Sequence, residues 1–298
     1  MERMDFTMFC ETVRDRIAEY LLQYEIETIR IEHVRHNNGI EHTGLVITKQ
    51  GESVSPTIYL EQYYNAMKKD IKTFEEILCL IAQEYNRICV RIEAQGEMEI
   101  NMEQVEKNVF LRLINYEKNS GMLENCPYIP FHDMAITFRY LVKMDEEGIA
   151  SALLDFDTLK RSKLSVEELY CAAKDNTIRL FPPFVRRLDE FLQERYPQNI
   201  QYPEEPEIYI LSNQQFIYGA TMMIYKDVIA TIAEKIGKSM YIIPSSVNEV
   251  LLCFTETQTE REMLENTLQE VNEFVVSDLD YLSDAVYFYD KELGNIVS

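Results

Sequence analysis

Two short apolar runs on either side of a polar turn constrain the fold of this chain more than any other feature. The stretch from Tyr241 to Phe254 reads Tyr-Ile-Ile-Pro-Ser-Ser-Val-Asn-Glu-Val-Leu-Leu-Cys-Phe. Runs this short and this rich in Ile, Val and Leu are typical of buried strands, and Pro-Ser-Ser is typical of a turn. The stretch therefore predicts a β-hairpin, which we place at the centre of a C-terminal lobe.

Other patterns predict where helices begin. Apolar residues recur every three or four positions from Met4 to Tyr24, which predicts an amphipathic helix. Thr73 with Glu76, and Ser165 with Glu168, match the capping box, in which a hydroxyl and a carboxylate satisfy the first backbone amides of a helix. Each pair predicts a helix behind it.

Turn residues predict two further hairpins and several breaks. Asn38-Gly39 lies between two apolar runs and favours a tight hairpin turn, and the acidic turn Asp145 to Gly148 predicts a second hairpin. Two prolines precede a helix predicted over Phe184–Arg195. The segment Tyr196–Glu207 carries three prolines and little apolar material, so it is predicted to be a loop or linker.

The order of the predicted elements defines the fold class. In the last third, strands alternate with helices predicted over Gly219–Ile236 and Glu260–Val276. Paired strands separated by helices predict an α+β fold with mixed or antiparallel sheets and helices packed on one face. Breaks at Asn119-Ser120-Gly121 and at the prolines that follow predict two α+β lobes, 1–120 and 121–298.

The charge of the chain narrows its partners. The formal net charge is −22, which repels phosphate backbones and anionic lipid headgroups. We therefore expect no nucleic acid and no membrane as partners. A positively charged protein partner is favoured instead.

The cysteines and the hydropathy predict the compartment. The six cysteines are scattered without a Cys-x-x-Cys pair, which is typical of a reducing compartment. No stretch reads as a secretory signal or a membrane span. The sequence thus predicts a cytoplasmic protein.

Several segments resemble a bacterial family of uncharacterised proteins that is classed only as a domain of unknown function. The matching segments cover most of the chain from about residue 40 onward and are Pro56–Leu60 with Tyr64, Leu113–Asn115, Ile208–Asn213, Gly219-Ala220, Ile243–Glu249, Glu270–Asn272 and Leu282–Tyr289. Where the family pattern has a His in the Pro-Ser-Ser turn, this chain has Asn248. Asn cannot act as the base that activates a serine, and the family carries no established activity. The resemblance therefore implies a fold and leaves the function open.

The turn is the first candidate binding site. Ser245, Ser246, Asn248 and Glu249 bring hydroxyls, an amide and a carboxylate together beside a predicted core, so they are the candidate ligand-binding residues. The competing interpretation is local, because such side chains often bond to the backbone of their own turn. We favour the local interpretation.

A weaker candidate is a metal site at the first hairpin. His33, His36 and His42 lie around the turn, and zinc accepts imidazole ligands. Their spacing matches no metal motif, and neighbouring strand residues point to opposite faces. We therefore predict no metal and no other cofactor.

Two further clusters hold residue types of catalytic or cation sites. Cys126, His132 and Asp133 are the types of a thiol nucleophile with its base and acid, although His132-Asp133 more plainly fixes the start of a strand. Asp155 and Asp157 at a strand end could share a proton or bind a cation, but exposed acids at the end of a strand are the commoner explanation.

No catalytic motif stands out, and the sequence favours a binding or adaptor module over an enzyme. The expected function is recognition of a protein partner through the acidic surface. The alternative is a ligand-processing or hydrolase-like enzyme centred on the Pro-Ser-Ser-Val-Asn-Glu turn.

Overall fold

The computed structural model describes residues 4–51, 55–95, 100–145, 148–195, 207–254 and 261–297. The chain divides into two compact units: unit 1 is Met1–His36 with Ile40–Glu99, and unit 2 is Asn37–Gly39 with Ile100–Ser298. Within the described ranges, none of the helices combines the length and the apolar character that a membrane crossing needs.

Unit 1 is a three-stranded antiparallel sheet with helices that share its core. Its elements are α1 (Phe6–Arg16), the 3₁₀ helix η1 (Ile17–Tyr20), β1 (Ile26–Arg35), β2 (Glu41–Lys49), β3 (Thr57–Tyr59), α2 (Glu61–Lys68) and α3 (Phe74–Gln95). The strand order is β1-β2-β3. The predicted helix and first hairpin are confirmed, and Asn38 and Gly39 both have positive φ, as a tight turn requires.

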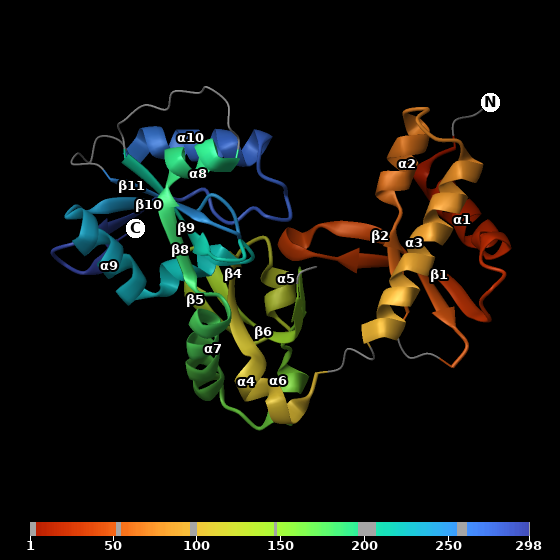
Figure 1. Ribbon diagram of the computed structural model, residues 1–298, viewed down its shortest axis with the longest axis horizontal. Coiled ribbons are helices and arrows are strands. Elements are labelled where there is room, and N and C mark those ends of the chain that lie inside the picture. Colours follow the sequence, from red (N-terminus) through yellow and green to blue (C-terminus); the bar gives the residue numbers. More distant parts are fainter. Residues whose placement is uncertain are drawn as a thin grey trace. The chain divides into compact units, whose positions relative to one another are not determined.

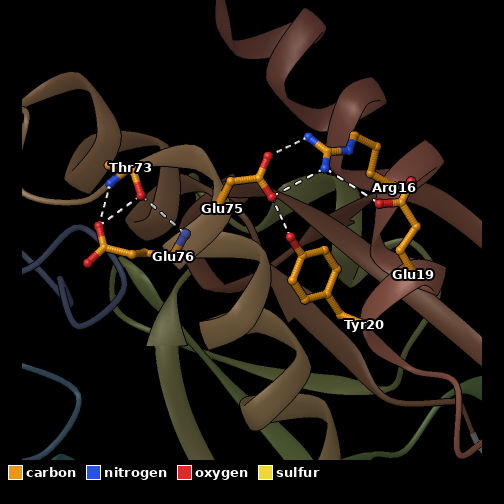
Figure 2. Close-up of polar contacts among 6 residues, drawn as sticks. All are labelled: Arg16, Glu19, Tyr20, Thr73, Glu75 and Glu76. Atoms are coloured by element: carbon orange, nitrogen blue, oxygen red, sulfur yellow. Dashed lines mark hydrogen bonds and ion pairs between the residues drawn. The ribbon is translucent and has the colours of Figure 1, made fainter.

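Polar contacts fix the start of α3 in unit 1. Figure 2 shows Glu75 between Arg16 and Tyr20: Arg16 donates to its two carboxylate oxygens at 2.8 and 3.2 Å, and the Tyr20 hydroxyl donates to it as well. Beside it the predicted capping box is confirmed, since the Thr73 amide donates to Glu76 Oε2 at 2.8 Å and the Glu76 amide to Thr73 Oγ1 at 3.3 Å.

Unit 2 holds two antiparallel sheets. One contains β4 (Val109–Asn115), β5 (Tyr128–Phe131), β6 (Met134–Asp145) and β7 (Gly148–Leu153), and β6 pairs with the other three. The other has the order β13-β12-β10-β11-β9-β8, formed by β8 (Pro183–Arg187), β9 (Glu207–Asn213), β10 (Met240–Ile243), β11 (Val250–Phe254), β12 (Tyr287–Asp290) and β13 (Asn295–Val297). The predicted hairpin is thus confirmed, and its strands β10 and β11 are the two middle strands (Figure 1).

Helices and 3₁₀ turns complete unit 2. They are η2 (Asn37–Gly39), η3 (Met102–Gln104), α4 (Val105–Asn108), α5 (Ser120–Leu123), α6 (Phe156–Ser162), α7 (Val166–Leu180), α8 (Leu188–Arg195), η4 (Gly219–Ile224), α9 (Lys226–Ile236) and α10 (Arg261–Phe274). The capping box at Ser165 and Glu168 is confirmed at the start of α7. The predicted lobe boundary after residue 120 lies inside unit 2, where β4 pairs with β6.

Both faces of the six-stranded sheet are covered, whereas one covered face was predicted. Met240 and Ile242 of β10 share a buried core with α9, and Tyr241 and Ile243 share a second one with Leu268 of α10. Side chains alternate along a strand, so a strand that is apolar at every position needs cover on both sides. The α+β class with antiparallel sheets is confirmed.

Two predicted helices begin later than expected. The first four residues of the helix predicted over Phe184–Arg195 belong to β8, an edge strand that starts at Pro183 and pairs with β9, and α8 begins at Leu188. The helix predicted from Gly219 is the 3₁₀ helix η4 as far as Ile224, because Tyr225 is extended and separates it from α9. The predicted linker, apart from Glu207, and the two acids at the tip of the second hairpin lie outside the described residues.

Candidate functional site

The Pro-Ser-Ser turn bonds mainly to itself. The Ser246 hydroxyl donates to Glu249 Oε1 at 2.6 Å and accepts the Asn248 amide at 3.0 Å, and the Ser246 amide donates to the Glu249 carbonyl at 3.2 Å. Ser246 is buried. These contacts are the local hydrogen bonds expected if the turn bonds to itself and not to a ligand. Ser245 and Glu249 are nevertheless only half-buried.

Asn248 joins the turn to two other segments of unit 2. Its carbonyl accepts the Ser212 hydroxyl at 2.6 Å, and its Oδ1 accepts the Tyr218 amide at 3.1 Å. Its Nδ2 lies 3.5 Å from Asp280 Oδ1. Asn248 therefore holds the β9–η4 loop and the segment before β12 against the hairpin.

The β9–η4 loop is shaped by one buried amide and one glycine. Asn213 Oδ1 accepts the amides of Gln215 and Ile217 at 3.1 and 3.3 Å, and its Nδ2 donates to the Ile217 carbonyl at 2.7 Å. The loop ends at Tyr218, whose φ of 55° is left-handed, followed by Gly219. A Cβ on Gly219 would lie 2.4 Å from the Asn248 carbonyl oxygen, so the loop and the turn meet at the backbone.

Burial changes the acidity of the carboxyl group in the turn. Burial, together with the nearby charge of Asp280, raises the pKa of Glu249, and the hydroxyl of Ser246 opposes this effect. The side chain therefore takes up a proton more readily than an exposed glutamate.

We expect Glu249→Gln to become more stable, relative to the unchanged protein, as the pH rises. With a raised pKa, the stabilising contribution of Glu249 is fully present below its ordinary value of 4.5 and is lost as the pH rises through the raised value. Glutamine keeps an oxygen for Ser246 and has no charge to bury. Urea unfolding from about pH 4 to about pH 8 measures the difference, and the exposed Glu124→Gln is the control. An equal pH dependence in the two variants would contradict the assignment.

A groove on unit 2 gathers carboxylates and tyrosine rings. It has a volume of about 640 Å³ and is lined by Asn115, Tyr116, Glu117, Asp133, Tyr281, Asp284 and Ala285. Hydrogen bonds fix two of its acids: Asp133 accepts the hydroxyls of Ser283 and Tyr287, and Asp284 accepts Asn272 Nδ2 at 2.8 Å. Burial and the charge of Asp284 raise the pKa of Tyr281, so its hydroxyl is neutral.

The three histidines of the first hairpin do not converge. His36 and His42 have ring centroids 4.9 Å apart and both pack on Tyr59. His33 lies opposite Thr43 in the strand register, one position away from the pair Val34 and His42, so it belongs to the other face. In the described part of the chain, no group of three or more His, Cys, Asp or Glu side chains is placed to hold a metal ion.

Cys126 is separated from the acid and imidazole that follow it in the sequence. It is buried in an apolar cluster, and burial raises the pKa of its thiol to about 11. The ring of His132 packs on Tyr287, with centroids 4.7 Å apart, and Asp133 bonds to that same tyrosine. The arrangement orders the turn between β5 and β6 and leaves the thiol protonated.

The two aspartates after β7 have a local role. Asp155 accepts the Thr158 amide at 2.7 Å and is the N-cap of α6, with Asp157 in the first turn. Hydrogen bonds from Thr158 lower the pKa of Asp155. The charge therefore stabilises a helix start.

The sequence interpretation missed two arginines on the β4–β6 sheet. Arg112 and Arg139 approach the ring of Tyr218, which the Asn248 contact holds in place. A signal for them exists in the sequence, since Arg112 lies within the apolar run 109–114 and Arg139 within the run 134–142, and a charged side chain is uncommon in such runs. The partner ring could not be found this way because it comes from a distant loop.

Fold and site together define a two-unit α+β protein in which polar side chains join separate backbone segments. The chain belongs to a family of unknown function, DUF5688, whose model matches residues 6–291. This agrees with the resemblance inferred from the sequence, whose segments Ile208–Asn213, Gly219-Ala220 and Ile243–Glu249 meet around Asn248. No curated protein and no solved structure matches the chain.

Proposed function

We propose that this protein is an adaptor that binds a basic segment of a partner protein in the groove of unit 2. The observation that carries the proposal is the combination in one groove of three carboxylates, Glu117, Asp133 and Asp284, with the tyrosine rings at 116 and 281. Carboxylates attract an ammonium or guanidinium group, and an aromatic face stabilises it further.

The groove suits this role in two ways. Lys118 Nζ lies 3.5 Å from the centroid of Tyr281, so this ring is placed to bind an ammonium group, and a cation of the partner would displace Lys118 from it. The hydrogen bonds to Asp133 and Asp284 hold both carboxylates in place before any partner arrives. The net charge of −22 would also steer a basic partner towards the protein.

The scattered cysteines support the further proposal that the protein acts in the cytoplasm.

A Lys/Arg-rich peptide should bind the full chain in isothermal titration calorimetry, and more weakly as salt is added. Glu117→Gln removes one charge of the groove, and Tyr116→Ala removes one ring. Each substitution should weaken binding by about fivefold. Glu124→Gln, which removes an exposed acid outside the groove, is the matched control. Absence of binding at low salt, or an equal loss in the control, would contradict the proposal.

A ligand-processing enzyme centred on the turn is the second candidate. It is favoured by the 2.6 Å contact between the Ser246 hydroxyl and Glu249, whose raised pKa makes it a better proton acceptor. If this turn is a catalytic site, Ser246→Ala should abolish labelling by a serine-reactive fluorophosphonate while Ser245→Ala retains it. Labelling that survives in Ser246→Ala, or no labelling of the unchanged protein, would eliminate this candidate.

A further inference from the structure

Two arginines lie on one face of the four-stranded sheet in unit 2. In the β4–β6 register, Arg112 is opposite Thr137 and Arg139 is opposite Phe110. Phe110 and Arg112 are two residues apart on β4 and therefore share a face, and Arg139 shares the face of Phe110, its partner across the ladder. Both arginine side chains thus leave the sheet on the same side. The other face of these strands belongs to the main core of the unit.

The ring of Tyr218 packs against the two guanidinium groups and against Phe110. The guanidinium carbon of Arg112 is 4.5 Å from the centroid of the Tyr218 ring, and that of Arg139 is 5.8 Å from it. The Tyr218 and Phe110 rings are stacked, with centroids 6.2 Å apart and an angle of 21°. The backbone of Tyr218 is itself held by a hydrogen bond from its amide to Asn248 Oδ1.

The two guanidinium groups differ in what holds them. Arg139 Nε and Nη2 donate to the hydroxyl and carbonyl of Ser151 at 2.9 and 2.8 Å. The Nε of Arg112 is buried and has no hydrogen-bond partner. Within the described ranges, neither arginine forms an ion pair with a carboxylate.

Two half-buried positive charges beside one ring would be stabilised by a counter-charge. Burial, and to a smaller extent the charge of Arg139, lower the pKa of Arg112 to about 10, and burial lowers the pKa of Arg139. Arg112 is thus still charged at neutral pH. The acid that acts on Arg112 is Asp280, whose carboxylate is already bonded to the Ser277 hydroxyl at 2.8 Å and is approached by Asn248.

We propose that Arg112 and Arg139 form a binding site for the oxyanion group of a small molecule, a phosphate or a carboxylate. A guanidinium group offers donors in a fixed plane that match two oxygens of such a group. Arg112 is half-buried, and among the described residues its two terminal nitrogens donate to no protein acceptor, so these are the donors that would meet the anion. Tyr218 and Ser151 hold the two planes in place before binding. The site is separate from the acidic groove and does not depend on the proposed adaptor function.

The test is isothermal titration calorimetry of the full chain with inorganic phosphate in one arm and acetate in the other, at an ionic strength held constant with sodium chloride. Binding in either arm is expected, and the tighter arm identifies a phosphoryl or a carboxylate ligand. Arg112→Met should weaken that binding by about tenfold or more, because a charge-assisted donor is lost. Arg186→Met, an exposed arginine paired with Glu190 and Glu194, should leave it unchanged.

Thermal unfolding without added anion separates this site from a purely structural cation–π cluster. For a binding site, Arg112→Met should leave the unfolding midpoint unchanged or raise it, because a half-buried charge without an ion-pair partner is removed. A structural role instead predicts a lower midpoint in Arg112→Met and no anion binding by the unchanged protein. If Arg112→Met fails to fold, Arg112→Lys replaces it, because lysine keeps the charge but lacks the planar set of guanidinium donors. Arg112→Lys should also bind the anion more weakly. Full affinity in Arg112→Lys, or no binding of either anion by the unchanged protein, would overturn the proposal.

Discussion

Gly219→Ala is expected to destabilise unit 2 by about 3 kcal/mol, near the upper end of what overpacking costs. The added Cβ would lie 2.1 Å from Ser212 Oγ, 2.4 Å from the Asn248 carbonyl oxygen and 2.8 Å from the Asn213 amide nitrogen. The hydroxyl can rotate away, but the other two atoms belong to the backbones that the glycine allows to meet. Relief therefore requires the loop to separate from the hairpin, which would break the contacts of Asn248 described above. Urea unfolding measures the change in the free energy of unfolding.

The matched control is Gly237→Ala at the end of α9. Gly237 has a φ of +87° and no atom within 4 Å of its would-be Cβ, so it reports backbone strain without a clash. That strain costs about 1 to 2 kcal/mol. Combining Gly219→Ala with Ser212→Ala should recover only part of the loss, since the carbonyl of Asn248 remains in the way. Full recovery in the double variant would show that the hydroxyl alone required the glycine.

The parts of the fold that can be predicted from the sequence are those encoded within a few residues. The hairpin of β10 and β11 is predictable because two apolar runs flank one turn, and α7 because Ser165 and Glu168 satisfy the first amides of the helix. β5 and β8 were not predicted as strands, because each contains a proline and pairs along one side only. Their strand conformation depends on partners, β6 and β9, that lie elsewhere in the sequence.

The same limit applies to the candidate site. The local interpretation of Ser246 and Glu249 follows from residues three apart, and the structure has that bond. The role of Asn248 cannot be predicted from nearby residues, because Ser212, Tyr218 and Asp280 contact it from other segments of the chain. Arg112 and Arg139 could be noticed as charges within apolar runs, yet the sequence cannot say that both face Tyr218. A buried charge is thus a useful signal of a site whose partners remain unknown.

Asn213→Ala is expected to destabilise unit 2 by about 2 to 3 kcal/mol, because buried backbone groups lose their partners. Asn213 is 1% exposed, and its side chain alone bonds two amides and one carbonyl of the β9–η4 loop. The loop needs this support because Phe216 and Tyr218 both have left-handed φ values, 54° and 55°, which are unfavourable for residues with a Cβ. Urea unfolding of the variant measures the loss.

Asn213→Asp separates the two kinds of bond made by Asn213. Aspartate keeps an oxygen for the amides of Gln215 and Ile217 but replaces the donor to the Ile217 carbonyl with a second acceptor, so we expect a smaller loss than with alanine. Asn125→Ala is the control, because that exposed side chain makes a single 3.4 Å bond to the Gly121 carbonyl and should change stability by no more than about 0.5 kcal/mol. An Asn213→Ala variant as stable as Asn125→Ala would mean that water replaces the buried amide and that the loop reaches Tyr218 without it.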